Sequence, residues 1–166
     1  MADRILIGFA TRSGSTQEVA EAVAEALRGK GLQADLRPLR FVRSLAGYHM
    51  IVLGAPLYMF RWHRDATNFL SRHKDALSKL PVAVFALGPF HDEEKEWQDI
   101  RAQFDKELAK APWFAPVARE VFGGAFDPAK LRFPFNLIPA LKKMPASDIR
   151  NWDVIRAWAG DLASRP

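Results

Sequence analysis

The fold of this chain is decided by one stretch near its start, Ile5-Leu6-Ile7-Gly8-Phe9-Ala10-Thr11-Arg12-Ser13-Gly14-Ser15-Thr16. The first half of the stretch is apolar, which is typical of a parallel strand that is covered on both faces. The residues after it place apolar side chains at helical spacing, at Val19, Ala20, Val23, Ala24 and Leu27. The pattern therefore predicts a strand, a short loop and a helix in direct succession.

The loop at residues 11–16 carries groups that can hold a phosphate. Four of its six residues have hydroxyl groups, and its backbone amides lie at the positive end of the predicted helix. The candidate phosphate-binding residues are Thr11, Arg12, Ser13, Gly14, Ser15 and Thr16. The alternative interpretation is an ordinary capped helix, with Ser15 or Thr16 as the N-cap and Glu18 in the first turn.

Known nucleotide-binding patterns narrow the chemistry of this loop. It has no lysine, so it lacks the Gly-x-x-x-x-Gly-Lys-Ser/Thr pattern of nucleoside triphosphatases. Gly8 and Gly14 stand six residues apart, so the dinucleotide pattern Gly-x-Gly-x-x-Gly is also absent. With Arg12 as its one cation, the loop suits a phosphate monoester that is bound but not transferred.

Residues 5–16 resemble the phosphate loop of flavodoxins, which reads Thr-x-Ser/Thr-Gly-x-Thr directly after the first strand. The form Thr-Arg-x-Gly-x-Thr looks most like the branch that includes the flavodoxin-like menaquinone-dependent protoporphyrinogen oxidases. The resemblance covers nearly the whole chain and is strongest at 4–28, 48–75 and 81–90. It implies that the loop wraps around the phosphate of FMN.

The composition limits the other kinds of site. A length of 166 residues predicts one domain, spanning 1–166, with a substantial core. The absence of cysteine excludes disulfides, thiolate metal sites and cysteine nucleophiles. The four histidines do not have the spacing of metal ligands, so no metal site is expected. Because there is no signal peptide and no apolar run of membrane-spanning length, we expect a cytoplasmic protein.

The formal net charge is +5 and the pI is about 9.7. Such a charge favours nucleic acid, anionic lipid or an acidic protein as partner. The basic residues are scattered, however, and form neither a clustered face nor a known nucleic-acid-binding module. We therefore expect no nucleic acid partner, and a solvated basic surface is the simpler interpretation.

Strands and helices alternate along the rest of the chain. Strands are expected at 4–10, 32–38, 48–54, 82–87 and 117–122. Helices are expected at 16–28, 63–77, 93–110 and 151–163, with a helical turn at 41–46. Alternation of this kind predicts a three-layer α/β/α fold, a flavodoxin-like doubly wound parallel sheet of five strands in the order 2-1-3-4-5.

Two further loops open on the same edge of the predicted sheet. The second loop, residues 55–62, is rich in aromatic and soft apolar side chains, and the third, residues 88–92, begins with Gly-Pro after a strand. The resemblance implies that they enclose the flavin ring, with contacts from Ala55, Pro56, Leu57, Tyr58, Met59, Leu87, Gly88, Pro89 and Phe90. Tyr58 is the first stacking candidate and Trp62 the second. Alternatively, these aromatic side chains, Phe60 included, pack beneath the loops.

Two related folds are poorer matches. A receiver domain needs an aspartate after its third strand and an acidic pair after its first, where this chain has Gly54 and Ala10-Thr11. A dinucleotide-binding domain would use Asp35, near the end of the second strand, to bind a ribose, but the glycine pattern is wrong. We expect Asp35 to be a solvated strand residue.

The segment at about 125–147 is irregular and insertion-like. It contains four prolines, and apolar side chains such as Phe126, Phe133, Leu137 and Ile138 alternate with Lys130, Arg132, Lys142 and Lys143. It resembles the insertion after the fifth strand of the protoporphyrinogen oxidase-like branch. We hypothesise that residues 126–144 contact a membrane, a quinone or a partner protein. The alternative is a loop folded back over the sheet edge.

These observations predict an FMN-binding flavodoxin-domain protein that works in electron transfer. No side chain stands out as a catalytic acid, base or nucleophile, so the redox chemistry belongs to the flavin. Its partner would be a redox protein or a quinone, with peripheral contact at the inner face of the membrane. One alternative is a protoporphyrinogen oxidase-type enzyme with quinone as acceptor. Another, of a different class, is an interaction module without a cofactor.

Overall fold

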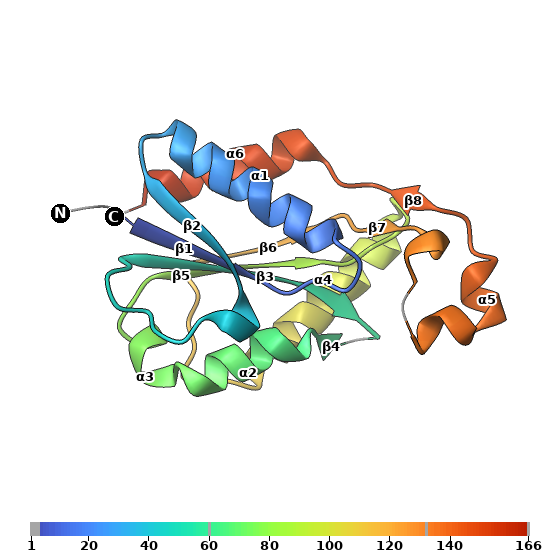
Figure 1. Cartoon of the computed structure of the whole chain (residues 1–166), viewed down its shortest axis with the longest axis horizontal. Helices are drawn as coiled ribbons and strands as arrows, with labels where there is room; N and C mark the ends of the chain where they lie inside the picture. Colours follow the sequence, from blue (N-terminus) through green and yellow to red (C-terminus); the bar gives the residue numbers. More distant parts are fainter. Residues whose placement is uncertain (1–3, 60, 132, 166) are drawn as a thin grey trace.

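The computed structural model describes residues 4–59, 61–131 and 133–165 (Figure 1). Phe60 and Arg132, which belong to the predicted aromatic loop and the basic segment, lie outside the described residues. The strands are β1 (Arg4–Phe9), β2 (Gln33–Pro38), β3 (Met50–Tyr58), β4 (Arg61–Trp62), β5 (Val82–Leu87), β6 (Ala118–Phe122), β7 (Ala125–Phe126) and β8 (Ser147–Asp148). The α-helices are α1 (Ser15–Gly29), α2 (Arg64–Arg72), α3 (Lys74–Leu77), α4 (Glu94–Ala109), α5 (Pro139–Lys142) and α6 (Trp152–Ala163). Short 3-10 helices are η1 (Leu39–Phe41), η2 (Pro128–Lys130) and η3 (Phe135–Leu137).

The main sheet is parallel and has the order β2-β1-β3-β5-β6, which confirms the predicted doubly wound arrangement. Ile7 of β1 pairs with Leu36 on one side and Val52 on the other. Helices α1 and α6 cover one face of the sheet, and α2, α3 and α4 cover the other (Figure 1). Since both faces are covered, the central strands are apolar along almost their whole length.

Alternate residues of β3 divide between the two layers of the core. Ile51 and Leu53 pack toward α2 and α4, whereas Met50 and Val52 pack toward α1 and α6. All four side chains are essentially inaccessible to solvent. The carboxyl ends of β1, β3 and β5 therefore reach the same edge of a rigid three-layer support.

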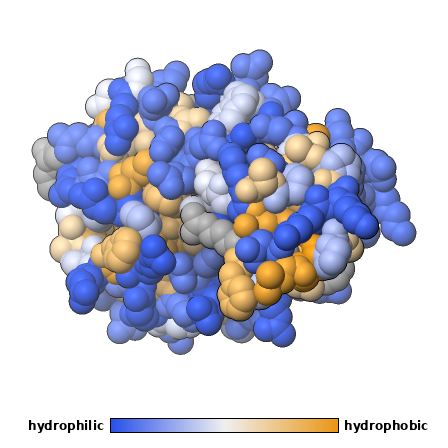
Figure 2. Space-filling model, turned by 45° about the vertical axis from the view of Figure 1, so that its right-hand side comes forward, coloured by the Kyte–Doolittle hydropathy of each residue, from blue (hydrophilic) through white to orange (hydrophobic). Residues whose placement is uncertain are grey.

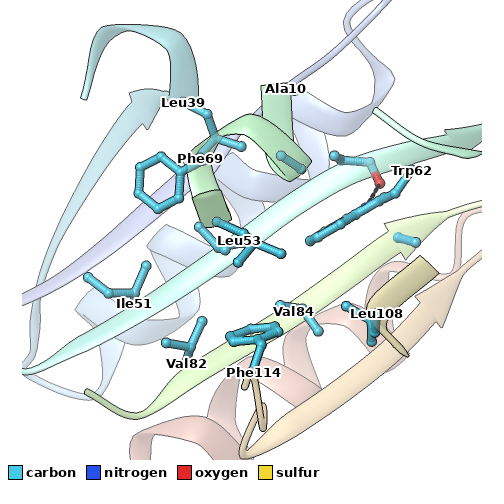
Figure 3. Packing of buried hydrophobic residues seen from close by; sticks show 14 of the residues in the cluster. Ala10, Leu39, Ile51, Leu53, Trp62, Phe69, Val82, Val84, Leu108 and Phe114 are labelled. Carbon is cyan, nitrogen blue, oxygen red and sulfur yellow. Dashed lines mark hydrogen bonds between the residues drawn. The ribbon is translucent and has the colours of Figure 1, made fainter. Parts of the chain in front are cut away.

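Trp62 is a core residue, so its interpretation as a second stacking candidate is wrong. Its indole nitrogen donates to the carbonyl oxygen of Ala55 at 3.0 Å, and Figure 3 shows the ring in the layer that also holds Leu53 and Val84. The ring also meets Phe104 edge-to-face, with centroids 5.2 Å apart. The reason is that β3 turns back on itself as β4, which directs Trp62 toward α4.

Three of the predicted element boundaries also need correction. Residues 55–58, expected in a loop, continue β3, because Ala55 and Pro56 pair with β5, and Leu57 and Tyr58 pair with β4 in an antiparallel hairpin. The helix expected at 63–77 is two helices that are separated at His73. The helical turn expected at 41–46 lies earlier, at Leu39–Phe41.

The segment at 125–147 is more ordered than expected. Its two ends pair with each other as β7 and β8, with Ala125 opposite Asp148 and Phe126 opposite Ser147. Between them, η2 and α5 begin at Pro128 and Pro139, where a missing N–H and a fixed backbone angle are favourable. The insertion is thus closed at its base, beside the carboxyl edge of the main sheet (Figure 1).

Asp35 is part of a polar cluster and not a free surface residue. It pairs with Leu6 in the middle of β2, so it is not at the strand end where a ribose would bind. Its carboxylate accepts a hydrogen bond from the Tyr48 hydroxyl at 2.8 Å and another from Arg4. The cluster connects β2 to the start of β1 and to the residues before β3.

We expect Tyr48→Phe to lower the free energy of unfolding by about 1 kcal/mol near neutral pH, because it removes one hydrogen bond to a partly buried carboxylate. The hydrogen bond from Tyr48, followed by the contacts with Arg4, lowers the pKa of Asp35. This stabilisation is therefore complete above the ordinary aspartate pKa of about 3.9 and is lost as the pH falls through the folded-state value. Urea unfolding of both proteins would measure it. A difference that does not shrink in strong acid would contradict this account.

Candidate functional site

A cavity of about 270 Å³ lies at the carboxyl edge of the sheet. The three predicted loops all contribute to its wall, as expected for parallel strands that end at one edge. From these loops the lining residues are Arg12, Ser13, Ser15, Pro56, Leu57, Tyr58, Leu87, Gly88 and Phe90. The segment after β6, which the sequence analysis considered for contact with a membrane, a quinone or a partner but not for the flavin site, supplies Gly124, Ala125, Phe126, Lys130, Leu131 and Phe133.

The start of α1 differs from the capped-helix interpretation. The N-cap is Gly14, not Ser15 or Thr16, and it has a left-handed backbone with φ of 98° that suits glycine. The Gly14 amide donates to the Thr11 hydroxyl at 2.8 Å, which closes the loop on itself. Because glycine has no side chain, α1 begins without a side-chain hydrogen bond to its first-turn amides.

Thr16 lies in this uncapped first turn and is completely buried. Its hydroxyl oxygen has no hydrogen-bond partner among the described residues. A buried hydroxyl without a partner costs free energy, so such groups are uncommon and call for an explanation. The free helix terminus and this hydroxyl together form a set of donors that fits a phosphate group.

The middle of the cavity is bordered by Tyr58, the last residue of β3. The guanidinium carbon of Arg12 lies 4.5 Å from the centroid of its ring, so the first and second loops contact each other directly. The charged residues that line the cavity in the described part of the chain are Arg12 and Lys130, and both are basic. The wall therefore combines an aromatic surface with a positive electrostatic potential.

The third loop and the segment after β6 form the opposite wall. The Gly124 amide donates to the Pro89 carbonyl at 2.8 Å, and the rings of Phe90 and Phe126 have centroids 5.6 Å apart. The signal for this wall was present in the sequence as Gly123-Gly124, directly after the fifth predicted strand. A strand end at that position must reach the same edge as the three loops.

Some predicted contact residues are absent from the lining of the cavity. Ala55 is buried in the core, where its carbonyl accepts the bond from Trp62, and Met59 is 73% exposed at the turn between β3 and β4. The others are Thr11, Gly14, Thr16 and Pro89. Thr11 and Gly14 bond to each other, Pro89 accepts from the Gly124 amide, and Thr16 is buried in the first turn of α1. His91, which follows the third loop's Phe90, is exposed, and both its backbone amide and its ring contact the Glu96 carboxylate.

Comparison with known families identifies the architecture. A model of the flavodoxin domain matches residues 6–144, which is most of the chain. The chain belongs to the flavodoxin domain family. This family implies FMN as the cofactor, and the donors at the start of α1 fit its phosphate.

Individual flavodoxin-domain relatives agree with the assignment. The chain is 28% identical over 134 residues to a protoporphyrinogen IX dehydrogenase [quinone] of Escherichia coli strain K12, covering 79% of this chain and 71% of that protein. Flavodoxin 1 from Bacillus cereus superimposes with a TM-score of 0.63 at 15% identity, over 99% of both chains. A flavodoxin from the domain Archaea gives a TM-score of 0.60 at 12% identity, over 96% of both chains. The two structures confirm the predicted fold.

We expect Thr16→Val to weaken FMN binding by about tenfold while leaving riboflavin, which lacks the phosphate, unaffected. The same change should raise the free energy of unfolding of the apoprotein by about 1 kcal/mol, because it removes a buried hydroxyl without a partner. Isothermal calorimetry and thermal unfolding would measure the two effects.

Thr67→Val is the control for this substitution, since Thr67 is a half-buried threonine near the start of α2 whose hydroxyl donates to the Arg64 carbonyl. It should leave FMN affinity unchanged. If Thr16→Val binds FMN as tightly as the wild type, the buried hydroxyl does not serve the phosphate.

Proposed function

We propose that this flavodoxin-domain protein binds one FMN in the cavity and exchanges electrons with a redox protein or a quinone. The observation that carries the proposal is the uncapped first turn of α1, in which the buried Thr16 hydroxyl has no partner among the described residues. FMN, when bound, supplies one- and two-electron transfer. The protein therefore has to hold the cofactor and control what reaches it.

The predicted contact residues divide this task in two. Ser13 and Ser15 of the cavity wall, the buried Thr16 hydroxyl and the first-turn amides of α1 would hold the phosphate. Arg12 and Lys130 would balance its charge. The ring would lie between Tyr58 on one side and the third loop, including Gly88 and Phe90, on the other. Leu131 and Phe133 would shield this region from water.

Titration of the purified apoprotein with FMN tests the proposal. We expect saturable binding of one FMN per chain, with the visible absorption of a flavin retained after gel filtration. Absence of both colour and binding heat would overturn the proposal and would support the alternative of an interaction module without a cofactor.

A second candidate is the oxidation of a porphyrinogen with quinone as acceptor. The similarity to the protoporphyrinogen IX dehydrogenase [quinone] supports it, as does the apolar wall that the segment after β6 adds to the cavity. The FMN-loaded protein would be incubated with protoporphyrinogen and a menaquinone analogue. Formation of protoporphyrin well above the rate with free FMN favours the enzyme, and its absence leaves the electron carrier.

We further propose that residues 126–144 make peripheral contact with an anionic lipid surface. Phe133, Leu137 and Ile138 are exposed, by 77%, 64% and 41%. Figure 2, which turns this side of the molecule forward, shows apolar side chains gathered among hydrophilic ones. Over 125–147 the sequence contains four basic residues and only Asp127 as an acid, so its charge complements anionic headgroups. No helix in the described parts of the chain has the length and apolar content needed to cross a bilayer.

Flotation with vesicles tests this contact. At low salt we expect binding to vesicles that contain phosphatidylglycerol and none to pure phosphatidylcholine, because the attraction is electrostatic in part. Replacing both Lys142 and Lys143 by Gln should lower the partition coefficient roughly 30-fold, at about 1 kcal/mol for each charge.

The apolar part of the contact needs its own variant. Phe133→Ser should reduce vesicle binding, whereas Phe41→Ser should not. Phe41 is also largely exposed, by 63%, and lies beside Arg40, but it belongs to η1 and not to the insertion. Equal binding to neutral and anionic vesicles, or equal effects of the two serine variants, would contradict the proposed surface.

A further inference from the structure

Arg150 lies in the connection between β8 and α6, beyond residue 144, where the family match ends. Its side chain is only 9% exposed although it carries a full positive charge. The guanidinium forms a two-pronged contact with Asp148, from Nε to Oδ1 at 2.9 Å and from Nη2 to Oδ2 at 2.7 Å. Its carbon lies 4.9 Å from the centroid of the Trp152 ring. The group is therefore held in one orientation from two sides.

The remaining guanidinium nitrogen, Nη1, contacts the start of α1. Nη1 donates to the Ser15 carbonyl at 3.2 Å and lies 3.4 Å from a carboxylate oxygen of Glu18. Ser15 is the first residue of α1 and lines the cavity, and Thr16 follows it directly. Arg150 thus connects the second half of the chain to the first turn that holds the candidate phosphate donors.

The same connection also reaches the opposite wall of the cavity through backbone hydrogen bonds. The Ile149 amide donates to the Gly124 carbonyl at 3.1 Å, and the Gly124 amide donates to the Pro89 carbonyl at 2.8 Å. A Cβ atom at Gly123 would lie 2.3 Å from the Ile149 carbonyl oxygen, so the two segments approach as closely as glycine allows. Residues 149–150 therefore join the phosphate loop to the third loop.

The charge of Arg150 is balanced within this cluster. The hydrogen bond with Asp148 raises the pKa of Arg150, and the same bond lowers the pKa of Asp148, so both groups stay ionised. Asp148 and Glu18 together offset the positive charge. Arg150 is absent from the lining of the 270 Å³ cavity but lines an adjoining hollow of about 360 Å³ together with Ser13, Ser15 and Lys130. Its hydrogen bond to the Ser15 carbonyl gives it a geometric contribution to the site.

We propose that Arg150 is a positioning residue for the phosphate of FMN. It keeps the first turn of α1 at the distance from the third loop that bound FMN needs. The phosphate can then contact the donors of α1 while the flavin ring contacts the third loop. The inference rests on the proposed function. It adds a residue from outside the loops that touch the cavity.

Parallel titrations of the apoprotein with FMN and with riboflavin test this role. Arg150→Met keeps much of the side-chain volume but loses all the hydrogen bonds, and we expect it to raise the Kd for FMN by about tenfold. The Kd for riboflavin should change by less than about twofold, because riboflavin has no phosphate to place. Arg156→Met is the matched control on α6, since Arg156 is 55% exposed and its Asp153 partner is 3.9 Å away. It should leave both constants unchanged.

The outcomes distinguish a failure of the proposed FMN binding from a failure of the positioning role of Arg150. If the wild-type protein binds no FMN, the proposed function and this inference are both overturned. If it binds FMN but Arg150→Met weakens both ligands equally, or neither, the positioning role alone is overturned.

Asp148→Asn tests the positioning role of Arg150 if the Arg150→Met variant does not fold. The substitution changes an exposed carboxylate, so the core is unaffected, yet it weakens the two-pronged contact. A smaller but still FMN-selective loss would support the positioning role. Unchanged FMN affinity in that variant would refute it.

Discussion

The parallel alignment of β1, β3 and β5 is the constraint on which this molecule depends. Because each strand must be followed by a crossover to the other end of the sheet, every loop at the carboxyl edge follows a strand end. Three such loops, together with the segment after β6, surround one cavity. The apolar core contributes indirectly, since it keeps the strands in register and so keeps the loops at fixed separations.

The cavity wall at the start of α1 has features that lower the stability of the apoprotein and that suit an anion. Gly14 provides the turn into the helix but no cap, and Thr16 keeps a buried hydroxyl without a partner among the described residues. Both features cost free energy in the apoprotein and both suit an anion at a helix terminus. The cluster around Arg150 contacts this turn, so the start of the helix is held by an ion-pair network.

Sequence reasoning worked best where a local pattern had one structural meaning. The apolar runs at Ile5–Phe9 and Val82–Leu87, separated by helical patterns, indicated parallel strands and led to the correct sheet order. It worked less well at 55–62, where the aromatic side chains suggested a binding loop. Pairing with β4 is a tertiary event that no local pattern encodes, and it buries Trp62 against α4 instead.

The sequence by itself determined the fold class, the family and the position of the candidate phosphate loop, because these follow from periodicity and from a short motif within one strand–loop–helix unit. Only the tertiary structure decided which side chains share the cavity. Phe126 and Lys130 reach it because β7 and β8 close the base of the insertion, and Arg150 reaches Ser15 across 135 residues of sequence. Contacts of that range depend on how the layers pack, which composition and spacing do not specify.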